Sequence, residues 1–132
     1  MYMNKSTILK TFNSHLMEFI NDVIKLMPED LDLRTAGTFI EGIKKVNPRL
    51  VITTWNNWIV SEYRTKIEEG DFSFFEDKDY GRDVVGTQNE KKILEVIDRI
   101  REDVKGMGSS NKEKTLKYMQ NLTKLSDIYF SQ

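Results

Sequence analysis

Apolar residues recur every three or four positions along most of this chain, which is the spacing of an amphipathic helix. The first stripe of this kind occupies residues 8–27. Ser6 or Thr7 can cap its start, because a short hydroxyl side chain accepts a bond from a free backbone N–H of the first turn. Pro28 marks its end, since proline cannot continue a helix. We therefore predict a long first helix that buries one face.

A second and shorter stripe covers residues 33–46, with Asp32 as its expected cap. Gly37 and Gly42 lie within it, and each lowers the intrinsic preference for helix by about 1 kcal/mol relative to alanine. Glycine also allows a neighbouring element to approach closely. We expect this helix to owe its stability to docking on the rest of the protein.

The third stripe, residues 48–69, contains both tryptophans of the chain. Asn47 is expected to cap its start, ahead of a proline that suits the first helical position. Gly70 is placed as the C-terminal cap. Trp55 and Trp58 lie three residues apart, so both should face the core. We interpret this segment as the central helix, around which the other helices pack.

Two further helices follow the third, each with a predicted capping box. Thr87 and Glu90 have this spacing at the start of the fourth helix, and Ser110 and Glu113 repeat it at the start of the last, after the glycines at 106 and 108. The last helix is expected to turn its apolar residues inward: Leu116, Met119, Leu122, Leu125, Ile128, Tyr129 and Phe130.

The pattern predicts an all-α protein, a compact bundle of about five helices in a single domain over residues 1–132. The irregular segment 71–86 lies between the third and fourth helices and is both aromatic and acidic. We expect it to fold back on the helices, with its aromatic side chains inserted and its acidic side chains in water.

The amino-acid composition excludes several classes of function. There is no cysteine, which excludes disulfides, thiolate nucleophiles and cysteine-bound zinc. Lysine and arginine number 20 against 21 acidic residues, so the chain lacks the basic excess of most proteins that bind phosphate non-specifically. The apolar run 8–27 is interrupted by charged and amide side chains. We expect neither secretion nor insertion into a membrane.

The sequence offers little for catalysis. His15 is the single histidine and has no nucleophile near it in sequence, so we interpret it as an ordinary helix residue. The acids of segment 68–83 are suitable ligands for magnesium or calcium, but their register does not match a calcium-binding loop: counted from Asp77, Gly81 takes the fifth place. We expect no enzyme activity, no metal and no cofactor.

Aromatic residues give the first candidate site, a surface for a protein partner. Packing in the core explains most of these side chains equally well. The candidates for partner binding are Trp55, Phe72, Phe74, Phe75, Tyr80 and Tyr129.

The locally basic stretch 99–124 gives an alternative site, for nucleic acid. A solvated helix face is the simpler explanation of these charges, and we favour it. The residues that would contact phosphate are Arg99, Arg101, Lys105, Lys112, Lys114 and Lys117.

Four segments of the chain are similar in sequence to segments of a known group of proteins. They are residues 12–19, residues 47–52, residues 67–71 together with 74–75 and 78–80, and residues 121–126. In these segments the chain resembles a group of small helical proteins with no assigned activity, encoded by large nucleocytoplasmic DNA viruses of algae and protists. The resemblance implies a viral setting and transfers no site residues.

These observations lead to one functional hypothesis and one alternative. We predict a non-catalytic viral protein that acts through protein–protein contacts, as a virion or minor capsid component or as an assembly adaptor. Its expected partners are viral structural proteins or a second copy of the chain, and its expected location is the host cytoplasm or the virion. The alternative is a nucleic-acid-associated factor of viral replication or transcription that uses the stretch 99–124.

Overall fold

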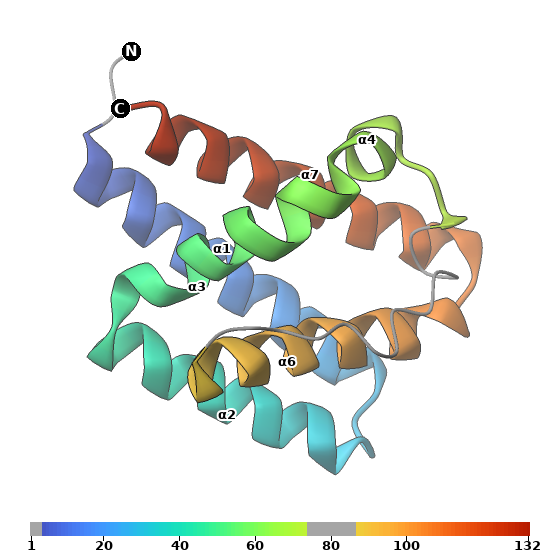
Figure 1. Ribbon diagram of the computed structural model, residues 1–132. Helices are drawn as coiled ribbons and strands as arrows, with labels where there is room; N and C mark the ends of the chain where they lie inside the picture. Colours follow the sequence, from blue (N-terminus) through green and yellow to red (C-terminus); the bar gives the residue numbers. More distant parts are fainter. Residues whose placement is uncertain (1–3, 74–86) are drawn as a thin grey trace.

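The computed structural model describes residues 4–73 and 87–132 and is all-α over these residues (Figure 1). The described chain forms five helical rods, as the apolar spacing predicts. The third rod is continuous but consists of two α-helices with a π-helix between them. The elements are α1 (Lys5–Leu26), α2 (Leu31–Val46), α3 (Pro48–Thr54), η1 (Trp55–Val60), α4 (Ser61–Glu69), α6 (Gln88–Lys105) and α7 (Ser109–Phe130).

Helix α1 lies at the centre of the bundle, because it contacts α2, α3, α6 and α7. It runs antiparallel to α7, and the rod formed by α3, η1 and α4 crosses over this pair (Figure 1). Helices α2 and α6 lie side by side and form the opposite edge. The largest fully buried side chains come from all of these rods except α7: Trp55, Phe12, Phe19, Ile8, Ile20, Leu33, Ile40, Ile52, Ile59, Ile67 and Ile93.

Two helices begin earlier than their sequence predicts. The cap of α1 is Asn4, not Ser6 or Thr7, and its Oδ1 accepts a hydrogen bond of 2.8 Å from the Thr7 N–H. The cap of α2 is Asp30, not Asp32, and its Oδ1 accepts a bond of 3.0 Å from the Leu33 N–H. Each segment offers several competent caps, and local sequence does not rank them.

The predictions for the other helix ends have mixed outcomes. Gly70 caps α4 in the left-handed conformation, at φ 68°, as predicted. The capping box of Thr87 and Glu90 is confirmed, since the Glu90 N–H donates to Thr87 Oγ1 at 3.2 Å. Asn47 is the N-cap of α3 ahead of Pro48, as predicted, but its side chain does not make the expected capping bond.

The capping box predicted at Ser110 and Glu113 is also wrong. Helix α7 begins at Ser109 and has Gly108 as its N-cap, without a side-chain bond. The Gly108 carbonyl accepts from the backbone N–H groups of Asn111 and Lys112 at 3.1 and 3.2 Å. The first turn therefore closes two residues ahead of the predicted cap, and Ser110 lies inside the helix.

The π-helix changes the expected orientation of the two tryptophans. Hydrogen bonds from i to i+5 widen the turn, so residues three apart diverge more than in an α-helix. Trp55 is fully buried and donates from Nε1 to Thr123 Oγ1 of α7 at 3.3 Å. Trp58 is only half-buried and donates to Glu90 Oε2 of α6 at 3.3 Å. Both side chains pack against the core, but they bind different helices.

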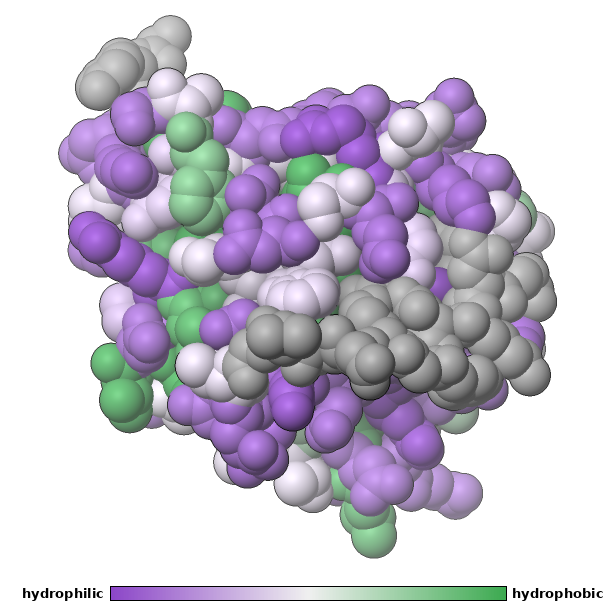
Figure 2. Space-filling model, in the orientation of Figure 1, coloured by the Kyte–Doolittle hydropathy of each residue, from purple (hydrophilic) through white to green (hydrophobic). Residues whose placement is uncertain are grey.

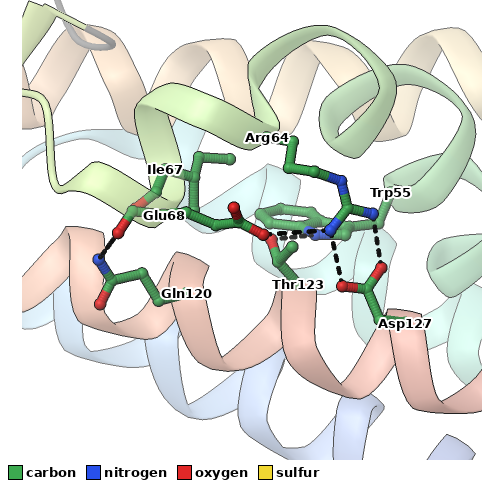
Figure 3. A network of polar contacts seen from close by, with 7 residues as sticks. All are labelled: Trp55, Arg64, Ile67, Glu68, Gln120, Thr123 and Asp127. Atoms are coloured by element: carbon green, nitrogen blue, oxygen red, sulfur yellow. Dashed lines mark hydrogen bonds and ion pairs between the residues drawn. The ribbon is translucent and has the colours of Figure 1, made fainter.

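A polar network fastens the third rod to α7 (Figure 3). Arg64 donates to both carboxylate oxygens of Asp127, at 2.8 and 2.7 Å, and to Glu68 at 3.2 Å. Gln120 donates from Nε2 to the Ile67 carbonyl at 2.9 Å. The arginine contact lowers the pKa of Asp127. Because Arg64 and Asp127 are partly exposed, we assign this pair to the register of the two helices more than to stability.

The end of α7 is less buried than expected. Tyr129 is 4% exposed, but Ile128 and Phe130 are each 43% exposed. Consecutive helix residues point about 100° apart, so three in a row cannot all face the core. Tyr129 takes the inward direction, and the prediction for its two neighbours is wrong.

Candidate functional site

A groove lies between α2 and α6. Its volume is about 480 Å³, within the range of many ligand sites. Apolar side chains of Ala36, Phe39 and Val96 line it, and polar side chains surround them. Ala36 and Phe39 are three apart on α2, which places them on one face of the helix. The other lining residues are Asp32, Thr35, Lys92, Glu95 and Arg99.

The basic side chains of the groove already have partners. Lys92 Nζ lies 5.5 Å from the ring centroid of Phe39, in a cation–π contact. Arg99 contacts Asp30 Oδ2 through Nε and Nη2, both at 2.8 Å. Arg99 is therefore neutralised by a carboxylate of the protein, whereas Lys92 is exposed and lies over a neutral ring.

The acidic side chains of the groove are more available. Glu95 is exposed and has no ion-pair partner among residues 4–73 and 87–132. Asp32 is 86% exposed and reaches Arg99 only at 4.0 Å. The groove therefore combines an apolar floor with a rim of two acidic and two basic side chains, of which the acids have the weaker contacts within the protein.

The structure places the six aromatic candidates in different environments. Trp55 and Tyr129 are buried in the core, so their assignment to a partner surface is corrected: neither side chain can reach a partner in this fold. Phe72 is half-buried and packs against the core. The other three candidates, Phe74, Phe75 and Tyr80, lie outside the described residues, as does most of the aromatic and acidic segment.

The basic stretch does not form one phosphate-binding face. Arg99 is held by Asp30, as described above. Arg101 is only 4% exposed, and its guanidinium lies 5.0 Å from the ring centroid of Tyr63 and 3.3 Å from Asp98. Both arginines are therefore corrected from phosphate ligands to structural contacts. The remaining candidates differ in exposure: Lys114 and Lys117 are exposed, and Lys105 and Lys112 are half-buried.

A second hollow, of about 170 Å³, lies between α1 and α7. Tyr118 donates from its hydroxyl to Asp22 there, and its ring stacks on Phe19 with centroids 5.0 Å apart. Burial raises the pKa of Tyr118 above its ordinary value. His15 lies against the same tyrosine ring, at 5.0 Å between centroids. These contacts tie two helices together and leave little space for a ligand.

Exposed apolar side chains are scattered over the described surface. The view in Figure 2 is mostly hydrophilic, with small apolar areas separated by polar ones. No helix in the described ranges has the length and apolarity needed to cross a membrane. In the same ranges, no three acidic, histidine or cysteine side chains gather as a metal site would require. The large exposed apolar residues are Leu26, Leu31, Val46, Ile128 and Phe130.

Sequence reasoning missed the groove because its two walls are more than fifty residues apart. Phe39 and Ala36 belong to the apolar stripe of residues 33–46; both pack against the core but are only half-buried, which leaves them partly open to the groove. A signal was present on α6, where Lys92, Glu95 and Arg99 follow the spacing of one helix face. The sequence does not show that this face lies beside Phe39.

Comparison with protein-family models, with curated proteins and with solved structures finds no match for this chain. The resemblance to viral proteins therefore stays a prediction.

Proposed function

We propose that this protein is a non-catalytic binding module, whose α2–α6 groove receives a basic, amphipathic segment of a partner protein. One observation supports this proposal most directly: Arg99 is bound to a carboxylate of the protein and Lys92 lies over the Phe39 ring, while Glu95 has no ion-pair partner among the described residues. An apolar groove whose acids have weaker contacts than its bases favours a ligand with apolar anchors and flanking lysine or arginine.

The shape of the groove fits a helical ligand. Two neighbouring helices form its walls, and its apolar floor is a strip that includes Phe39 and Val96. An amphipathic helix binds such a strip through residues spaced three and four apart. In the viral setting that the resemblance implies, the partner is a structural protein of the virion, and the module acts in assembly.

The test uses two synthetic helical peptides of equal length, one made of leucine and lysine and one of leucine and glutamate. We expect the basic peptide to bind and the acidic peptide not to bind, measured by fluorescence anisotropy at low salt. Backbone NMR shifts on titration should be largest around Phe39 and Val96. Glu95→Lys should weaken binding of the basic peptide about tenfold, the effect of about 1.4 kcal/mol.

The matched control is Glu113→Lys, which makes the same charge change on an exposed position of α7. If both variants lose the same affinity for the basic peptide, the loss comes from the net charge of the protein and not from the groove, and the proposal is contradicted. Shifts centred away from α2 and α6 would also contradict it.

Two other occupants are outcomes of the same experiment. If analytical ultracentrifugation finds a dimer that Glu95→Lys dissociates, that result would show that the groove binds a second copy of the chain and not a separate partner protein. Tight binding of an oligonucleotide that weakens steeply with salt, with no binding of the basic peptide, would favour nucleic acid instead.

A further inference from the structure

Two buried carboxyl groups lie beside Arg99 at one end of the α2–α6 groove. Asp30 lies in the connection before α2 and caps that helix, and Asp103 lies in the last turns of α6. Their side chains are 6% and 8% exposed, and both contact the guanidinium of Arg99. Neither position belongs to the sequence motifs discussed above.

Among residues 4–73 and 87–132, Arg99 is the cation that contacts both of these acids. Arg99 binds Asp30 Oδ2 at 2.8 Å, but its Nε is 3.8 Å from Asp103 Oδ2. Asp103 Oδ2 is buried and has no hydrogen-bond partner among the described residues. Glu102 on α6 and Asp32 on α2 add negative charge nearby. A proton on Asp103 would turn an unpaired acceptor into a donor toward Asp30.

Electrostatics favour such a proton. Burial, followed by the contact with Asp30, raises the pKa of Asp103 to about 6. The pKa of Asp30 is lowered, first by the hydrogen bond from Asp103 and then by backbone and arginine contacts. Two acids with pKa values pushed apart in this way titrate as a pair and hold one proton between them.

We propose that Asp30 and Asp103 form a proton-binding site that regulates the groove through Arg99. With one proton shared, Asp30 balances the charge of Arg99, and Asp103 is neutral. Loss of the proton places a second carboxylate beside Arg99 and makes the groove end more acidic. A basic segment then binds more tightly, and by linkage its binding expels the proton.

This inference rests on the proposed function for its effect on binding, but the proton site itself can be measured without a ligand. The first experiment is an NMR titration of the side-chain carboxyl carbons in the free protein. We expect one carboxyl group to titrate near pH 6 and to be absent from Asp103→Asn. If every aspartate titrates near its ordinary value, the inference is overturned.

Thermal unfolding gives a second measurement on the free protein. The pKa of Asp103 is raised in the folded state, so its contribution favours folding at low pH and is lost as pH rises from about 4 to about 6. Asparagine keeps a donor toward Asp30 and cannot ionise. Asp103→Asn should therefore raise the melting temperature by about 5 °C at pH 7.5 and change it little at pH 4.5. The control Glu113→Gln should show no such pH dependence.

The third experiment measures binding of the basic peptide at pH 5 and pH 7.5. We expect affinity to increase about tenfold at the higher pH in the wild type, and not in Asp103→Asn. Binding that is equal at both pH values in the wild type would overturn the regulatory role. A titration near pH 6 without any peptide binding would contradict the proposed function while leaving the proton site established.

Discussion

The two glycines of α2 allow a matched test of how that helix is packed. Gly42 is exposed, and a methyl group added there meets nothing within 4 Å. Gly42→Ala should therefore gain the full difference in helix propensity, about 1 kcal/mol of unfolding free energy. At Gly37 the same methyl group would lie 3.2 Å from Ile24 Cδ1 and 3.3 Å from Ile20 Cγ2 of α1.

Those contacts at Gly37 are shorter than ordinary van der Waals separations, and both neighbours belong to a packed helix. Overpacking of this kind costs about 1–3 kcal/mol, which offsets or exceeds the gain in propensity. We expect Gly37→Ala to be neutral or to destabilise by up to about 2 kcal/mol. The difference between the two variants is then about 1–3 kcal/mol, although both replace a glycine of one helix with alanine.

The assay is urea unfolding followed by circular dichroism, with a thermal scan as a second measurement. Gly42→Ala should raise the melting temperature by about 3–5 °C. Equal stabilisation by both variants would show that α1 does not approach α2 at Gly37, and would refute the packing described here. Destabilisation by Gly42→Ala would show that this face of α2 is not open to solvent.

Two further predictions concern single hydrogen bonds. Thr87→Ala removes the cap of α6 and should lower the unfolding free energy by about 1 kcal/mol, measured by urea unfolding; an unchanged value would contradict the role of this cap. Thr123→Val leaves the buried Trp55 indole N–H without its acceptor and should cost about 1–3 kcal/mol, whereas the exposed control Thr65→Val should cost much less.

Local patterns predicted the elements of this fold well. The spacing of apolar residues located all five helical rods, and the pair of Thr87 and Glu90 located the start of α6, because both signals act within one or two turns of chain. Gly70 was identified for the same reason, since only glycine adopts its left-handed conformation freely. These features depend on neighbours in the sequence.

Features that depend on distant partners were missed or wrong. Asp30, not Asp32, caps α2, and Asp30 is held by Arg99 from another helix. Trp55 and Trp58 belong to a π-helix and donate to Thr123 and Glu90, which lie far along the chain on different helices. No pattern within a single segment contains that information.

The candidate site shows the same division. The partner surface predicted from aromatic content includes Trp55 and Tyr129, but both side chains are buried in the core. Large aromatic side chains are as common in cores as at binding surfaces, so aromatic content alone does not distinguish the two. The groove and the carboxyl pair each combine residues of α2, or of the connection before it, with residues of α6. Sequence identifies the side chains, and only the arrangement of helices brings them together.

The pairing of α1 with α7 has a consequence for synthesis of the chain. Phe19 of α1 stacks on Tyr118 of α7, and Lys5 Nζ lies 4.6 Å from the ring centroid of Tyr129. The partners are 99 positions apart in the first contact and 124 in the second, so α1 leaves the ribosome long before α7 is synthesised. A nascent chain that ends before α7 therefore carries an open apolar strip along α1, and the core closes only when the last helix emerges.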